Sequence, residues 1–418
     1  MINNKVDVKN PYSKKIQKLS VMADPILFGP LLVLFFYNLN QFALIPYLGL
    51  ISENNASLIT ASIVGLALTS KSVAEKLSLF GISVLNLNYK KTTILTFGLF
   101  IRAICFFIIN LYFNPIILIA SVAIIGVAGS MIRPTVRSIL NDNPNTNIKD
   151  KVFSLMFLFS NLGGIIGPLL VSLNLNIWFK NNLLACLAIL DLFLALLVIK
   201  IFSKEEKDTD DKMVSIEQKE NPSIFQNITS VYLSNRNLIN IYLLHMSFWI
   251  TVSLCIMLVS FLNKISPELS SYRGYIFGIE GVVVVIVQVL LMKKYWTDRL
   301  LSKTFASLSV FILFLGVFLL MYGNSLFVFL SAGVLIGVSE GILGPYIYNS
   351  FSKNLKSVDV QKAFSALLLF ELFGDMIGYS VSGFILSNVQ INYNFANLFG
   401  IVVLIIMFMG VLRIKNES

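Results

Sequence analysis

The sequence predicts an all-α membrane protein with twelve transmembrane helices in two six-helix bundles. Of the 418 residues, 56% are hydrophobic and only 13% are charged, and the mean hydropathy is +0.80. Soluble domains carry about 25% charged residues, so the composition favours a membrane protein. The apolar residues also gather in runs close to the roughly 20 residues that a helix needs to cross a bilayer. These runs cover residues 25–50, 57–83, 92–112, 115–140, 152–173, 182–202, 238–262, 275–292, 303–322, 326–349, 361–387 and 394–412.

The polar segments divide the twelve runs into two sets of six. The first run is not a signal peptide by its pattern, because a long polar stretch precedes it and no small-residue cleavage site follows. The only long hydrophilic segment inside the chain mixes both signs of charge without periodicity, which is typical of a solvated linker. We therefore expect an N-terminal tail (1–24), a first bundle (25–202), a linker (203–236), a second bundle (237–412) and a C-terminal tail (413–418).

The basic residues predict the orientation of the chain in the membrane. Lys and Arg number 32 against 22 Asp and Glu, a net charge of +10 that could indicate a nucleic-acid partner in a soluble protein. Here 25 of the 32 fall in tails and alternate loops that share one side, and only Lys180, Lys264 and Arg273 fall in the opposite loops. Basic loops stay cytoplasmic. We expect a multi-pass protein of the cytoplasmic (plasma) membrane, with both termini inside and no nucleic-acid partner.

The two sets of spans repeat each other. A shift of 211 residues aligns 123–167 with 334–378 without a gap, and 13 of the 45 positions are identical. Both copies have the same direction, and such parallel repeats place a substrate site at their interface near the bilayer midplane. The identities include Gly126 with Gly337, Pro134 with Pro345, Lys151 with Lys362, Gly163 with Gly374 and Gly167 with Gly378.

Three segments resemble one branch of a known family. Residues 163–168 read GGIIGP, residues 134–151 combine Pro, Asn-Asp and Lys-Asp-Lys, and residues 337–345 read GVSEGILGP. They are similar, in this order, to the fifth span, the connection between the fourth and fifth spans, and the tenth span of the drug/proton antiporter branch of the major facilitator superfamily. The resemblance covers essentially the whole chain. It implies efflux by alternating access of two bundles and coupling to protons.

The glycine-rich segment has a physical reading of its own. Glycines on a spanning helix permit close contact between helices, and a proline loosens a helix locally. We therefore expect Gly163, Gly167 and Pro168 to serve packing and gating. The resemblance also places Arg102 and Asp191 on helices outside the central cavity, where a structural role is expected.

Acidic residues inside the spans are the candidates for carrying protons. An ionisable residue near the bilayer centre costs about 2.5–3.5 kcal/mol on insertion scales, so each needs a reason. The second half holds Glu280, Glu340, Glu371 and Asp375. Glu371 and Asp375 lie one helical turn apart on one face, and two such acids in a poorly hydrated cavity cannot both ionise cheaply. We expect all four to take part in proton coupling, with a fixed ion pair as the alternative.

Basic and polar residues of the spans are the candidates for binding substrate. Lys71 and Glu75 lie one turn apart on the second span, and Arg133 lies in the inner third of the fourth. Cations facing the cavity would favour an anionic or polycarboxylate substrate. The alternatives are that Lys71 only neutralises Glu75 and that Arg133 snorkels to the surface. Four further polar candidates face either the cavity or a neighbouring helix: Asn38, Gln41, Asn161 and Gln288. The single His245 is the last candidate, with a helix contact or a proton relay as the alternatives.

Metal and cofactor chemistry is not indicated. The chain has one His and three scattered Cys, without a CxxC pair or a His/Cys cluster. No phosphate-binding glycine loop of the Walker type is present, so ATP is not the energy source within this chain. We expect no metal and no cofactor. A multispan enzyme, the main hypothesis from another class, would need an acid/base pair, often with a metal or a His, and is not favoured.

The leading hypothesis is a proton-coupled exporter, an antiporter, of a small organic molecule. Cations in the first half favour an anionic or polycarboxylate product, and the chain is similar to carboxylate siderophore exporters of staphylococcal type; a drug-like compound is the other option. An importer or symporter of organic anions remains open, because the same charges would serve it. The expected partners are a small-molecule substrate, protons and the lipid bilayer, and we expect a monomer.

Overall fold

The structure is a computed structural model of the 418-residue chain. The predicted N-terminal tail and all of the predicted linker except Arg236 lie outside the described residues, as do the last four residues of the predicted C-terminal tail. The described residues are 25–55, 57–141, 146–173, 177–202, 236–355, 360–387 and 393–414.

The described residues are almost entirely helical, which confirms the predicted fold class. Eleven helices are long and apolar enough to cross a membrane. The remaining predicted span, the second along the chain, is α3; it has 28 residues, but its centre carries charged side chains. The long helices are α2 (Pro25–Asn54), α3 (Ala61–Asn88), α4 (Lys91–Leu111), α5 (Pro115–Asn141), α6 (Thr146–Ser172), α8 (Leu183–Phe202), α10 (Arg236–Ser260), α12 (Arg273–Leu291), α14 (Lys303–Tyr322), α15 (Leu326–Lys353), α16 (Val360–Ser387) and α17 (Tyr393–Arg413).

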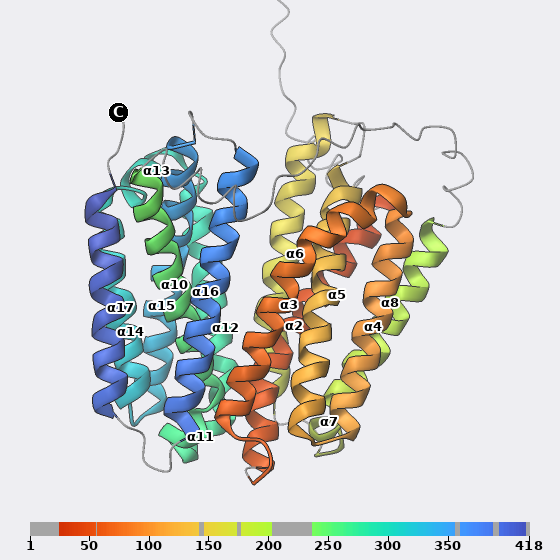
Figure 1. The fold of residues 1–418 in the computed structure, drawn as a ribbon, viewed down its shortest axis with the longest axis horizontal. Helices are drawn as coiled ribbons and strands as arrows, with labels where there is room; N and C mark the ends of the chain where they lie inside the picture. The colour runs from red at the N-terminus through yellow and green to blue at the C-terminus, as the bar shows by residue number, and fades with distance from the viewer. Residues whose placement is uncertain are drawn as a thin grey trace, which may run out of the picture.

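These helices run side by side in two groups, α2 to α8 on one side and α10 to α17 on the other (Figure 1). We call the groups the N-half and the C-half. Short elements lie between spans: α7 (Ile177–Asn181) and α11 (Leu262–Ile265) at one end of the molecule, and α13 (Lys294–Leu300) at the other. By the predicted orientation, the α13 end is cytoplasmic and the α7/α11 end faces outward.

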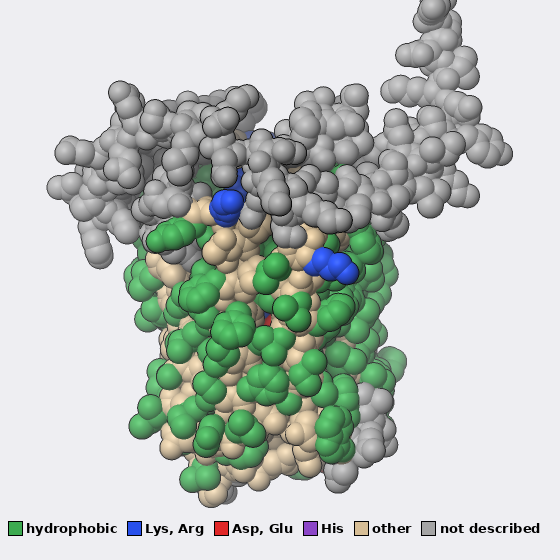
Figure 2. Space-filling model, turned by 90° about the vertical axis from the view of Figure 1, so that its right-hand side faces the viewer, with side chains coloured by type: hydrophobic (Ala, Val, Ile, Leu, Met, Phe, Trp, Pro, Cys, Tyr) green, Lys and Arg blue, Asp and Glu red, His purple; other side chains and the backbone are tan. Residues whose placement is uncertain are grey.

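The outer surface suits a bilayer. Figure 2 shows hydrophobic side chains over the middle of one face, with the basic side chains of that face near its upper edge. Many large apolar residues are exposed, among them Ile116, Phe193, Leu196, Phe327 and Phe384. A soluble protein would rarely expose so large a contiguous apolar surface. Lipid contact accounts for it.

Glycines bring α6 against α2 in the N-half. A Cβ at Gly163 would overlap the carbonyl oxygen of Phe35, and a Cβ at Gly167 would overlap that of Leu39. Since nothing projects from these two positions, the helix backbones touch directly. The helix α6 continues through Pro168 without a break. The glycine-rich segment of α6 thus packs closely against the backbone of α2.

The C-half repeats this crossing between α16 and α10. A Cβ at Gly374 would lie 2.6 Å from the carbonyl oxygen of Met246, and one at Gly378 would lie 2.7 Å from that of Ile250. Each of these four residues lies 211 positions after its counterpart in the N-half. The register found in the sequence therefore extends to α2 and α10, and corresponding residues of the two halves can be compared position by position.

The halves meet along two long helix pairs. Helix α3 packs on α16, where Gly65 and Gly383 bring the backbones together, and α6 packs on α12, where a Cβ at Gly274 would overlap the Pro168 carbonyl. Both crossings lie toward the α7/α11 end. Polar contacts between the halves also cluster there: Ser62 with Ser387, Ser172 with Gly274, and Glu53 with Arg273.

Candidate functional site

The ionisable residues of the interior gather where the two halves face each other. We call this set the central charge network. It draws three residues from α3, one from α5, one from α10 and two from α16, so four helices and both halves contribute. Its members are Lys71, Glu75, Lys76, Arg133, His245, Glu371 and Asp375.

In the N-half, one carboxylate lies between two cations. The Oε2 atom of Glu75 is 3.4 Å from the Lys71 ammonium, and its Oε1 atom is 3.1 Å from Nη1 of Arg133. The Lys71–Glu75 contact is the one-turn pair expected from their spacing. The Arg133 side chain remains 41% exposed, whereas those of Lys71 and Glu75 are 13% and 14% exposed. Arg133 therefore combines an ion pair with access to solvent.

Tyr37 of α2 lines the same place. The Arg133 guanidinium lies over its ring, 5.4 Å from the centroid. The side chain is buried, and its hydroxyl has no hydrogen-bond partner among the described residues. Gly129 of α5 leaves room beside it, since a Cβ there would lie 2.7 Å from the Tyr37 hydroxyl and 3.6 Å from the Glu75 carboxyl carbon. The Arg133 guanidinium and the ring and unpaired hydroxyl of Tyr37 thus lie next to the Glu75 carboxylate.

Lys76 links the two halves and was not among the residues predicted from the sequence. Its ammonium lies 2.6 Å from Oδ2 of Asp375 and 3.1 Å from Oε1 of Glu371, both on α16, and donates to the Ser72 hydroxyl at 3.0 Å. The sequence does contain a signal for this contact. The residues one turn before and after Lys76 are Ser72 and Phe80, so its own helix offers no counter-ion at that spacing. A buried ammonium without a local partner must find one on another helix.

This contact changes the expectation for Glu371 and Asp375. The sequence suggests two acids in a poorly hydrated site without a counter-charge, but the structure places one ammonium against both. Asp375 also accepts hydrogen bonds from Ser72 at 2.5 Å and from Ser253 at 2.9 Å. As placed, Glu371 and Asp375 form an ion-pair network between the halves, because Lys76 compensates much of their charge.

His245 lies beside this network on α10. Its Nε2 atom is 3.5 Å from Oε2 of Glu371, and neither ring nitrogen makes a hydrogen bond with the described residues. The ring packs edge-on against Trp249 and Tyr348, with centroids 6.2 Å and 5.8 Å away. The side chain is 1% exposed. The structure therefore brings His245 to an acid of the network but encloses it among aromatic rings.

A second pair of acids lies apart from this network. Glu280 of α12 and Glu340 of α15 have their carboxyl groups within hydrogen-bonding range of each other. One oxygen of Glu340 is buried without a partner, and neither residue forms an ion pair within the described part of the chain. A carboxylate can only accept hydrogen bonds, so a direct hydrogen bond between these two groups needs a proton on one of them. Within the described part of the chain, Glu280 and Glu340 form an acid pair without a paired cation.

The repeat relates this acid pair to the cations of the N-half. The backbone of Lys71 packs over Gly126, and the carbonyl of Glu280 lies 2.6 Å from a Cβ built at Gly337. Gly126 and Gly337 are 211 residues apart, so Lys71 and Glu280 hold corresponding places in the two halves. Glu340 likewise corresponds to Gly129, the glycine beside Glu75. One of these two places is basic in the N-half and acidic in the C-half, and the other holds a glycine in the N-half and an acid in the C-half.

The remaining polar candidates are divided between helix contacts and unpaired groups. Asn38 donates to Ser160 of α6 at 2.8 Å, and Asn161 donates to a carbonyl of its own helix. The structure therefore uses both amides within or between helices. Gln41 is buried, and Gln288 has one buried oxygen without a partner in the described residues. Neither of them contacts the central charge network in any ion pair or hydrogen bond that the structure records.

Arg102 and Asp191 form a separate ion pair between α4 and α8. Nη2 of Arg102 lies 2.5 Å from Oδ1 of Asp191, its Nε donates to Oδ2 at 2.7 Å, and Asn40 donates to Oδ1 at 2.7 Å. Both side chains are 0% exposed. The pair is sealed from solvent, which agrees with the structural role expected from the resemblance.

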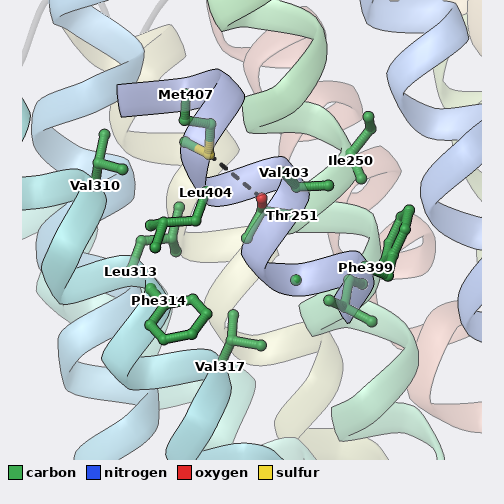
Figure 3. A pocket seen from close by; sticks show the side chains of 12 residues that line it. Ile250, Thr251, Val310, Leu313, Phe314, Val317, Phe399, Val403, Leu404 and Met407 are labelled. Atoms are coloured by element: carbon green, nitrogen blue, oxygen red, sulfur yellow. Dashed lines mark hydrogen bonds between the residues drawn. The ribbon is translucent and has the colours of Figure 1, made fainter. Parts of the chain in front are cut away.

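An apolar pocket in the C-half is too small to be the site. Figure 3 shows it between α10, α14 and α17, with Thr251 donating to the Met407 sulfur at 3.5 Å. Its cavity volume is about 20 Å³, which is little more than one water needs. The side chains that line the pocket are apolar except for the Thr251 hydroxyl. An organic anion would find neither space nor charge there, so the central charge network is the candidate site.

Comparison with known proteins supports the architecture. The sequence profile of the Major Facilitator Superfamily matches residues 31–294. The chain belongs to the major facilitator superfamily. Like other members it is a membrane transporter with the superfamily fold, and not an enzyme.

Solved transporters of this superfamily fold share the whole architecture at low sequence identity. A mutant of the nucleoside transporter NupG superposes with a TM-score of 0.75 at 15% identity, covering 94% of this chain and 100% of that one. The peptide transporter POT in complex with sulfate gives 0.68 at 14% identity, covering 94% and 97%. No curated protein matches the chain. At such identities the likeness concerns the fold, and the substrate must be argued from this chain's own residues.

Proposed function

We propose that this superfamily member is a proton-coupled exporter of a small anionic organic molecule. One observation carries the proposal: the place that Lys71 holds in the N-half is held by Glu280 in the C-half, and each has a further charged residue near it, Arg133 through Glu75 in the one and Glu340 in the other. A carrier that moves an anion against protons needs a cationic site and a protonatable site, and the repeat supplies a matched place for each.

The cationic site favours an anion over a cation. Lys71 and Arg133 share one carboxylate, that of Glu75, so the three charges leave one positive charge over. The partly exposed guanidinium of Arg133 offers further donors, and its planar fork matches carboxylates and phosphates. A lipophilic cation would meet repulsion here.

The acid pair supports coupling to protons. Two half-buried carboxyl groups near each other, with no cation paired to them among the described residues, favour the state in which they share one proton over the state with two negative charges. Such a pair takes up and releases a proton as its access to water changes. We assign Glu280 and Glu340 the main part in this, and Glu371 and Asp375 a part through their ion pairs with Lys76.

The structure is closed at its α7/α11 end, and this agrees with export. Helix pairs α3–α16 and α6–α12 meet toward the α7/α11 end, where Ser62 bonds Ser387 and Arg273 pairs with Glu53. By the predicted orientation this end faces outward, so the structure represents a form closed to the outside, the form in which an exporter is loaded. The resemblance of residues 163–168 to drug/proton antiporters also favours export. A polycarboxylate such as a siderophore, or a drug-like anion, fits the cationic site.

Uptake by symport with the same anion is the second candidate, favoured by the balance of the network. Apart from His245, the central charge network holds three basic and three acidic side chains. An entering anion adds one negative charge, which one proton on Glu371 or Asp375 would neutralise. Anion and proton would then travel together.

Transport in proteoliposomes with an imposed pH gradient tests the proposal and separates the two modes. Citrate serves as the anionic probe and ethidium as the cationic one. For antiport, an acidic lumen drives citrate uptake; for symport, an acidic exterior does. The Glu340→Gln and Glu280→Gln variants should lose the pH-driven part of citrate flux by at least about tenfold, the loss expected of a positioned proton-transfer group.

The exposed Glu268 supplies the control, since Glu268→Gln removes an acid outside both sites. It should transport like the unmodified protein. Undiminished pH-driven flux in both Glu340→Gln and Glu280→Gln would contradict the assigned role of the acid pair. Flux elicited by ethidium alone would overturn the anionic substrate.

A further inference from the structure

We infer that Glu75 is an internal counter-ion whose carboxylate occupies the place of the transported carboxylate, so that substrate binds Arg133 and Lys71 by displacing it. The inference rests on the proposed function in one respect, that the substrate is an anion, and it names the carboxylate group and the atoms that receive it.

The geometry around Glu75 is that of a bound ligand. Each oxygen has its own cation, Lys71 at 3.4 Å and Arg133 at 3.1 Å, and each cation comes from a different helix. A carboxylate of a small molecule placed between the same two cations would make the same two contacts. Charge-assisted contacts of this kind are the strong ones in protein recognition.

Solvent access separates this ion pair from a merely structural one. The Arg102–Asp191 pair has both side chains 0% exposed, and its hydrogen bonds go to each other, to Asn40 and to the Tyr37 carbonyl. The Arg133 side chain is 41% exposed although it stands on a spanning helix among other helices. A solute in the water that reaches Arg133 can therefore reach the contact with Glu75.

The neighbouring residues leave the place unfinished without an exogenous group. The Tyr37 hydroxyl is buried beside Glu75 with no partner in the described residues, an arrangement that costs free energy and calls for an acceptor. Gly129 contributes no side chain at this position, whereas its counterpart in the C-half is Glu340. At this place the N-half holds the Tyr37 hydroxyl, 2.7 Å from a Cβ built at Gly129, with the Glu75 carboxyl carbon 3.6 Å from the same point.

Chemical rescue tests the inference on the full chain in detergent. The Glu75→Ala variant removes the internal carboxylate and leaves a space for acetate between Lys71 and Arg133. Its thermal unfolding midpoint should fall, and acetate should restore it along a saturable curve, because a ligand that binds only the folded state stabilises it by mass action. Chloride at equal ionic strength should not.

Two variants serve as controls. Asp191→Ala removes a carboxylate from an ion pair that solvent does not reach, so acetate should not restore its unfolding midpoint. The double variant Glu75→Ala with Arg133→Gln lacks one of the two cations, so its response to acetate should be lost. A response of Asp191→Ala equal to that of Glu75→Ala, or no saturable response of Glu75→Ala, overturns the inference.

The Glu75→Gln variant keeps the test decisive if Glu75→Ala does not fold. It preserves the shape of the side chain but removes the competing charge, so citrate should bind roughly tenfold tighter than to the unmodified protein, within the coupling measured for close charge pairs. Unchanged or weaker citrate binding would contradict displacement. Because these measurements follow binding, they separate from the proposed function, which fails only in the transport assay.

Discussion

Replacing Gly163 by Ala should weaken the packing of α6 on α2 far more than the same change one residue later. A Cβ at Gly163 would overlap the Phe35 carbonyl oxygen and lie 2.9 Å from the Leu39 amide nitrogen. Ordinary contact begins at 3.4 Å, and both neighbours are backbone atoms of a helix that cannot turn aside. The two helices must therefore separate.

The magnitude follows from the cost of overpacking. Extra methyl groups forced into a packed interior cost about 1–3 kcal/mol. At Gly164 the nearest atom to a Cβ is Cδ2 of the Phe42 ring at 3.5 Å, which is ordinary contact. Gly164→Ala should therefore be close to neutral. Both variants add the same methyl group to the same helix, so the difference between their unfolding free energies isolates the effect on the α2–α6 crossing.

Thermal unfolding in detergent, together with the transport assay, measures this difference. Gly163→Ala should unfold at a lower temperature and transport more slowly, whereas Gly164→Ala should behave like the unmodified protein. Equal midpoints for the two variants would refute the argument from close backbone contact. A larger loss in Gly164→Ala would show that the α2–α6 register is wrong.

Two further changes test the contact between the halves. Lys76→Gln leaves Glu371 and Asp375 without their cation and should slow transport at least about tenfold, since removing one partner of a buried ion pair costs about 3–5 kcal/mol. Adding Asp375→Asn to this variant should restore part of the transport rate. Strictly additive losses in the double variant would contradict the pairing. Cysteines at Thr69 and Ser380, whose hydroxyl oxygens lie 3.1 Å apart, should crosslink α3 to α16 and stop transport until a reductant is added. Full transport by the crosslinked protein would show that this contact does not open.

The fold was predictable because a bilayer leaves few choices. Backbone groups in hydrocarbon must bond within the segment, so long apolar runs become helices. Even so, the helices outlast their apolar runs: α3 continues to Asn88 and α15 to Lys353, beyond the predicted ends at residues 83 and 349. Hydropathy locates the hydrocarbon, whereas backbone hydrogen bonding continues into the polar region.

The site was predictable only where its contacts are local. The Lys71–Glu75 pair follows from one-turn spacing on a single helix. The contacts of Lys76 with Glu371 and of Arg133 with Glu75 join residues 295 and 58 positions apart, and they depend on where helices cross. Spacing says nothing about such crossings. The unexpected pairing of Glu280 with Glu340, on α12 and α15, has the same cause.

An internal counter-ion also answers a requirement that any carrier faces. Two unit charges 4 Å apart attract by about 4 kcal/mol at an effective dielectric constant of 20, so Lys71 and Arg133 without Glu75 would hold a carboxylate too firmly to release it. With Glu75 present, each binding event exchanges one carboxylate for another, and much of that attraction cancels. Binding then remains strong enough to select an anion and weak enough to let it leave, which conduction and transport alike require. The affinity that matters for export is therefore the difference between the substrate and Glu75.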